Sequence, residues 1–155
     1  MTTVKTVAKL HVVLVTDGTV IEYAPEIYVS SERAALEAER WAWILSGGGW
    51  LPVERPFDGR WVVGDRDVRI VVAEAPSDAS GSLWVGTYWS EDGLPDPEAV
   101  LLEGREAAVD WVQDAGDLGP VVATIDRPWF VGATYAWGDD EAYAVAHLGK
   151  RVGER

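Results

Sequence analysis

Short apolar runs of strand length recur along the chain, and two longer stretches carry apolar residues at helical spacing. The runs Leu10–Thr16 and Leu83–Trp89 are rich in the β-branched and aromatic residues that favour strands. Two shorter runs, Ile27–Val29 and Val100–Leu102, stand just before the helical stretches. The pattern therefore predicts two strands followed by a helix in each half of the chain.

Each helical stretch has one apolar face. In the first, residues 30–49, Ser30 or Ser31 can cap the N-terminus, and three consecutive glycines end the helix. Its apolar stripe consists of Ala34, Ala38, Trp41, Ala42 and Leu45, and that of the second stretch, residues 103–116, of Ala108, Trp111, Val112 and Ala115. Both helices are therefore expected to lie on a sheet, with Trp41 and Trp111 mostly buried.

A hairpin is predicted after each helix. The first joins Trp61–Gly64 to Val68–Ala73, and the second joins Trp129–Ala136 to Glu141–His147. Glycine and aspartate stand in both turns, as they do in hairpins generally. A further strand is expected near Val121–Ile125.

One stretch of the chain occurs twice. Residues 52–64, PVERPFDGRWVVG, match residues 120–132, PVVATIDRPWFVG, at six of thirteen positions. The match pairs Trp61 with Trp129, and a nearby offset pairs Trp41 with Trp111. We infer a tandem duplication of a β-β-α-β-β unit, over about residues 8–76 and 82–148. The paired tryptophans are expected to occupy the same core positions in both copies.

The predicted fold class is α+β. Two pseudosymmetric copies are expected to pack mostly antiparallel sheet against two helices and to form one compact domain over residues 1–155. The copies are expected to join edge to edge or face to face, because either arrangement covers sheet edges that would otherwise pair with other chains.

Composition and charge narrow the classes of function. The absence of cysteine excludes disulfides, thiolate metal sites and a cysteine nucleophile. Of the net charge of −13, residues 1–77 contribute −3 (11 acids, 8 bases) and residues 78–155 contribute −10 (15 acids, 5 bases). Charge of this sign repels nucleic acids and anionic membranes and attracts basic partners. No apolar run near residue 1 is long enough for a signal peptide. We expect a cytoplasmic monomer that binds neither nucleic acid nor membrane.

Catalytic and metal-binding motifs do not stand out. The two histidines, His11 and His147, each share a strand face with apolar residues. The acidic turns do not match a calcium loop, and Gly47-Gly48-Gly49 follows a helix, whereas phosphate loops precede one. We therefore expect no cofactor, no metal and no catalytic residue. A small enzyme that uses a carboxylate and His147 is one alternative.

Acids and aromatics in the second half predict a binding surface. Solvated acidic turns beside an aromatic side chain are suited to a basic protein, since charge speeds association and a buried aromatic adds affinity. We expect a non-catalytic protein that binds such a partner, as an adaptor or as an immunity or antitoxin protein that neutralises it. Asp110 and Asp114 on the second helix add to this charge. The expected contact residues are Asp92, Asp96, Glu98, Tyr135, Trp137, Asp139, Asp140 and Glu141.

Aromatic residues that do not recur between the copies suggest a second alternative. Two pseudosymmetric units can enclose a groove on their axis, and aromatic walls there would bind an aromatic or cationic small molecule. The residues predicted for this pocket between the repeats are Trp43, Trp84, Tyr88 and Trp89.

Overall fold

Two helices and two five-stranded sheets form the fold. The computed structural model describes residues 7–17, 23–76, 82–90, 99–114, 120–137 and 140–152. The helices are α1 (Ser31–Leu45) and α2 (Arg105–Gln113). Sheet A consists of β1 (Val7–Thr16), β2 (Glu26–Tyr28), β3 (Arg60–Val63), β4 (Arg66–Pro76) and β10 (Lys150–Arg151). Sheet B consists of β5 (Leu83–Ser90), β6 (Ala99–Glu103), β7 (Val121–Arg127), β8 (Phe130–Trp137) and β9 (Asp140–Leu148).

The strand order is similar in the two sheets. Sheet A runs β10-β2-β1-β4-β3, and sheet B runs β6-β5-β9-β8-β7. Every neighbouring pair is antiparallel except β10 with β2, where Lys150 lies opposite Glu26 in a parallel pair. Sheet A is therefore mixed and sheet B antiparallel. In each sheet the strand before the helix lies beside the first strand of that half, and the strands after the helix lie on its other side.

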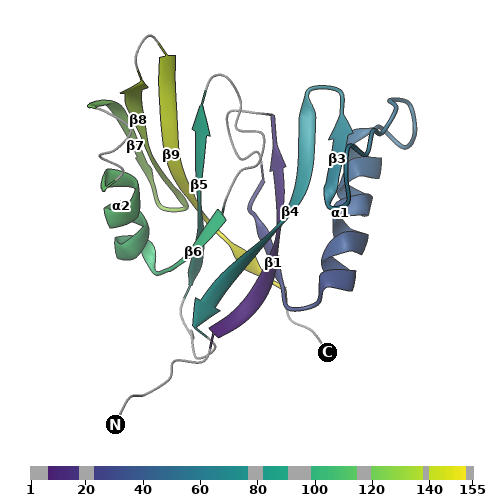
Figure 1. The fold of residues 1–155 in the computed structure, drawn as a ribbon, viewed down its shortest axis with the longest axis horizontal. Coiled ribbons are helices and arrows are strands. Elements are labelled where there is room, and N and C mark those ends of the chain that lie inside the picture. Colours follow the sequence, from purple (N-terminus) through teal and green to yellow (C-terminus); the bar gives the residue numbers. More distant parts are fainter. Residues whose placement is uncertain are drawn as a thin grey trace.

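The two sheets pack face to face, and each helix covers an outer face (Figure 1). The shared inner core is aliphatic, with Val12 and Leu14 of β1 against Leu83 and Val85 of β5. Alternate residues of the same strands face outward beneath the helices, because side chains along a strand point to opposite faces. The four layers are thus α1, sheet A, sheet B and α2.

Helix α1 lies close to sheet A through a row of small side chains. Ala34, Ala38 and Ala42 are buried against β1, β3 and β4. The Ser30 side chain caps the helix by accepting a hydrogen bond from the Arg33 N–H (3.2 Å). Three glycines with positive φ (69°, 77° and 106°), Gly47 to Gly49, end it, as the sequence predicted. Trp41 packs against this core without being fully buried, as Trp111 does in the second half.

Helix α2 buries Ala108 and Val112 against sheet B. The Trp111 ring lies over Gly86 of β5, where an added Cβ would come within 2.8 Å of it. Trp111 also contacts the Tyr88 ring at 4.5 Å between centroids. Gly86 therefore leaves room on β5 for an indole from the same half of the chain.

The predicted helices and strands are confirmed, but the paired tryptophans are not equivalent. Trp61 lies within β3 and is buried (3% exposed), whereas Trp129 is 52% exposed. Trp129 lies in the turn between the paired residues Arg127 and Phe130. The core position predicted for Trp129 was wrong, because residues 120–132 span β7 and β8 whereas residues 52–64 span a loop and β3.

Candidate functional site

An acidic face covers the outside of α2. Glu106, Asp110 and Asp114 recur every four residues on the side opposite the buried Ala108 and Val112, and all three are exposed. Glu103, just before the helix, continues the row. The last turn of α2 holds no basic residue, although the negative end of the helix dipole favours one there. The three acids thus repel one another, and Asp110 and Asp114 near the C-terminus also oppose the dipole, whereas Glu106 in the first turn is favoured by it.

Beside α2, β7 forms an edge of sheet B. It pairs with β8 and is exposed along its whole length of seven residues. Exposed apolar side chains include Val121, Val122 and Ile125. An ion pair between Arg105 and Asp126 joins α2 to this strand. The Arg127 guanidinium donates to the Asp126 carbonyl oxygen (3.1 Å).

A hollow lies on each side of β7. The inner one, of about 470 Å³, is lined by Ala123, Ile125, Phe130, Gly132, Thr134, Tyr143 and Val145, among others. Phe130, Tyr143 and Val145 also pack against the core between the sheets, so this hollow is on the inner face of sheet B. The outer hollow, of about 90 Å³, lies between α2 and β7 and is lined by Val109, Gln113, Thr124 and Asp126, among others.

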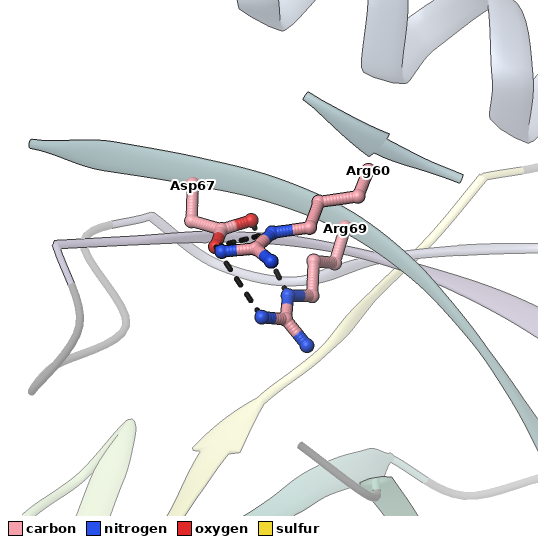
Figure 2. A network of polar contacts seen from close by, with 3 residues as sticks. All are labelled: Arg60, Asp67 and Arg69. Carbon is pink, nitrogen blue, oxygen red and sulfur yellow. Dashed lines mark hydrogen bonds and ion pairs between the residues drawn. The ribbon is translucent and has the colours of Figure 1, made fainter. Parts of the chain in front are cut away.

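On sheet A, two arginines share one carboxylate (Figure 2). Arg60 donates from Nε to Asp67 Oδ2 (2.9 Å), and Arg69 from Nε to Asp67 Oδ1 (3.3 Å). All three side chains are largely buried, and Arg69 is only 8% exposed. The network ties β3 to β4 and leaves one excess positive charge in an otherwise acidic protein. Because each group already has a partner within the hairpin, we interpret it as structural.

Near α1, a third hollow of about 250 Å³ is lined by Glu26, Glu37, Arg40, Trp41 and Ile44. Trp41 Nε1 donates to Glu26 Oε1 (2.7 Å), and Arg40 lies 3.7 Å from Glu37. Burial, and then the charges of Glu26 and Glu37, raise the pKa of the nearby Tyr28 hydroxyl. Both carboxylates are thus engaged within the chain, and we assign no ligand to this hollow.

The predicted partner-binding residues have different environments where the structure describes them. Tyr135 is buried (1% exposed) and its hydroxyl donates to the Val112 carbonyl oxygen, so it holds α2 on the sheet and cannot contact a partner. Glu141 is half-buried and accepts a hydrogen bond from the Tyr143 hydroxyl (3.3 Å). Trp137 and Asp140 end β8 and begin β9, but their side chains are outside the description. Asp92, Asp96, Glu98 and Asp139 lie outside the described residues.

The residues predicted for a pocket between the repeats lie in different layers. Trp43 is 62% exposed on α1, whereas Trp84 is buried and Tyr88 half-buried between sheet B and α2. None of these three residues lines any of the hollows described above. Trp89 belongs to β5, but its side chain is not described. His147, named for the enzyme alternative, has a pKa lowered by burial. Its described contacts are the Leu148 carbonyl oxygen (2.8 Å from Nδ1) and the Phe130 ring.

The sequence contains a signal for the acidic face of α2 but none for the edge position of β7. The four-residue spacing of Glu106, Asp110 and Asp114 within a helical stretch marks one exposed face. The apolar, β-branched start of β7 marks a strand but does not reveal that it lies at an edge.

No metal-binding group of three or more acidic, histidine or cysteine residues occurs in the part of the chain that the structure describes. Over the same residues, no helix has the length and apolar character needed to cross a membrane. No family model matches the sequence, and searches of the curated proteins and of the solved structures returned no match.

Proposed function

We propose that this protein is a non-catalytic acidic binding protein that engages a basic protein partner, as an adaptor or as an immunity or antitoxin protein that neutralises it. The acidic face of α2 carries the proposal. Glu106 and Asp110 are exposed on a helix of nine residues, and Asp114 is exposed at its C-cap. Arg105, the basic residue of that helix, is paired with Asp126.

The energetics of α2 support a role in binding. Like charges four residues apart destabilise a helix, and acids in the last turn interact unfavourably with its dipole. Solubility alone would be served equally well if all three acids lay near the N-terminus, as Glu106 does, because acids there stabilise a helix. A basic partner would relieve the repulsion, so the arrangement favours the complex over the isolated protein.

A fold-level proposal accompanies this one. We propose that the two halves descend from one duplicated β-β-α-β-β unit, with β1 equivalent to β5, β2 to β6, α1 to α2, β3 to β8 and β4 to β9. The matching orders β2-β1-β4-β3 and β6-β5-β9-β8 support it. In this alignment β7 and β10 are additions, one to the edge of each sheet.

The binding proposal is tested with two variants of equal charge. One replaces the α2 acids (Glu106→Gln, Asp110→Asn, Asp114→Asn), and the control replaces three exposed acids of the first half (Glu32→Gln, Glu39→Gln, Glu74→Gln). A basic protein captured from host lysate at low salt is purified, and its association rate with each variant is measured. We expect the α2 variant to slow association about tenfold or more, and the control to change it less than about twofold.

A double variant, Asp110→Asn with Asp114→Asn, keeps the favourable Glu106 carboxylate in the first turn and should unfold at a higher urea concentration than the wild type, because the repulsion between these acids and with the C-terminal end of the dipole is removed. If both triple variants slow association equally, net charge rather than the α2 face governs binding. If neither does, the acids serve solubility and the proposed function is wrong.

A further inference from the structure

We propose that the outer edge of β7 binds an extended segment of the basic partner by strand addition, and that this segment alternates basic and apolar residues. The inference rests on the proposed function and names the contact surface. An exposed edge strand presents unpaired backbone groups that another chain can bond. Within the residues that the structure describes, β7 pairs with β8 alone.

The register identifies the backbone groups that point away from the sheet. Arg127 and Phe130 are the pair that closes the two-residue turn at Pro128 and Trp129. Bonded and non-bonded pairs alternate along an antiparallel ladder, so with this closing pair bonded, Asp126 and Thr124 direct their backbone groups outward. The contact of the Arg127 side chain with the Asp126 carbonyl oxygen agrees with this direction. Thr124 therefore offers the outward N–H nearest the middle of the strand.

The surroundings of β7 determine which side chains an added strand could carry. Alternate side chains of a strand point to opposite faces. On the inner face they would lie beside the hollow lined by Ile125, Phe130 and Val145, which favours apolar side chains. On the outer face they would lie beside Asp126 and beside Val109 and Gln113 of α2, which line the outer hollow. The acids Glu106 and Asp110 lie on the adjoining, exposed face of the same helix, and together with Asp126 they favour basic side chains there.

Charge complementarity selects a basic segment over a second copy of this chain. Sheet B, α2 and the C-cap residue of α2 include seven acids but only two bases, Arg105 and Arg127, among the residues that the structure describes. Two such surfaces brought edge to edge would repel each other. The acids are Glu103, Glu106, Asp110, Asp114, Asp126, Asp140 and Glu141.

Among the residues that the structure describes, the other edge strands are bonded or packed by other segments, or are as short as the two residues of β10. The outer edge of β3 is bonded by Glu54, which exchanges two backbone hydrogen bonds with Val62 (2.9 and 2.8 Å). On the opposite side of sheet A, β10 covers β2. The outer strand β6 of sheet B packs against β4. β7 therefore differs from the other edge strands, because all seven of its residues are exposed.

The test uses two synthetic peptides of identical composition, one that alternates lysine and valine over eight residues and one with four lysines followed by four valines. Their affinities are measured for the wild type, for Thr124→Pro, and for the matched control Thr124→Val. Proline removes the outward N–H and is tolerated on edge strands, whereas valine retains it. Thr124→Val is also expected to preserve the strand, because valine is β-branched like threonine.

We expect the alternating peptide to bind the wild type and Thr124→Val at least about tenfold more tightly than the block peptide, and Thr124→Pro to lose this preference. Amide exchange at Thr124, followed by NMR, should slow at least about tenfold when the alternating peptide is added, because strand addition bonds that N–H. The exchange measurement uses the wild type and so holds even if Thr124→Pro does not fold.

The two proposals fail in different ways. Equal affinity for both peptides, lowered equally by the α2 triple variant, would overturn strand addition and leave the acidic binding function standing. Affinity independent of the α2 acids would overturn the proposed function itself. If the protein self-associates and Thr124→Pro abolishes this self-association, the edge of β7 binds a second copy of the chain. That result would overturn the proposal that a basic segment binds there.

Discussion

Substitution of Gly86 by alanine tests the packing of α2 on sheet B. An ideal Cβ at this position would lie 2.8 to 3.0 Å from three atoms of the Trp111 six-membered ring. These distances are too short for van der Waals contact, and a flat indole has no flexible end that can turn aside. Since Trp111 also packs against Tyr88, a shift of the ring would disturb α2 as a whole.

The magnitude follows from two opposing terms. Overpacking a well-filled site costs about 1–3 kcal/mol. Replacing a strand glycine by alanine returns about 0.5–1 kcal/mol, because the unfolded chain loses conformational freedom. The difference between the two terms is at most about 2.5 kcal/mol, and its middle value predicts that Gly86→Ala lowers the free energy of unfolding by about 1 kcal/mol.

A double-mutant cycle with Trp111→Ala supplies the control. Once the indole is gone, nothing blocks the new methyl group, and Gly86→Ala should stabilise that background by about 0.5–1 kcal/mol. Urea unfolding followed by far-ultraviolet circular dichroism measures all four proteins without depending on tryptophan fluorescence. The same effect of Gly86→Ala in both backgrounds would show that Trp111 does not lie over Gly86, and the reasoning about α2 would fail with it.

Three further substitutions test other contacts. Tyr135→Phe should lower the free energy of unfolding by about 1–2 kcal/mol, because the buried Val112 carbonyl oxygen loses its donor; an unchanged urea midpoint would contradict the bond. Asp67→Asn should lower the free energy of unfolding by about 2–4 kcal/mol, because Arg60 and Arg69 lose the carboxylate that they share. Asp67→Glu keeps a carboxylate and should lower the free energy of unfolding less. For His147, burial lowers the folded-state pKa below the ordinary 6.5, so the unfolded chain binds the proton more tightly. The stability contributed by the neutral His147 is full above pH 6.5 and is lost as the pH falls toward the folded-state pKa. His147→Phe should flatten this part of the plot of unfolding free energy against pH. The same plot for the variant and the wild type would contradict the prediction.

The elements of the fold could be predicted because their signals are local. Ser30 and the glycines after α1 mark its two ends, and the apolar runs of β1 and β5 each satisfy the strand pattern without reference to other parts of the chain. The opposite case is β10, in which two basic residues form a strand only because the edge of β2 is there to pair with them. No property of Lys150 or Arg151 predicts that pairing.

The candidate site was less accessible to sequence reasoning, because it depends on strand order. The run from Val121 was predicted as a strand, but its position at the edge follows from β8 pairing with β9 on its other side. Trp129 was misassigned for a related reason, since a match between two stretches of sequence cannot tell a strand from the turn beside it. Tyr135 was expected at the binding surface, and its burial became apparent only once α2 was seen to lie over β8.

The pairing of β10 with β2 also bears on the order in which the protein can be made. Sheet A gathers four strands from the first half of the chain, but its fifth is the last strand that the structure describes. More than one hundred residues separate Tyr28 from Lys150, and a ribosome takes on the order of ten seconds to add that many. During that interval the nascent first half exposes the backbone of β2, the kind of surface that recruits strands from neighbouring polypeptides. Only when translation has passed Arg151 can the chain close this edge itself, so the first half of the protein depends on the second to complete its folding.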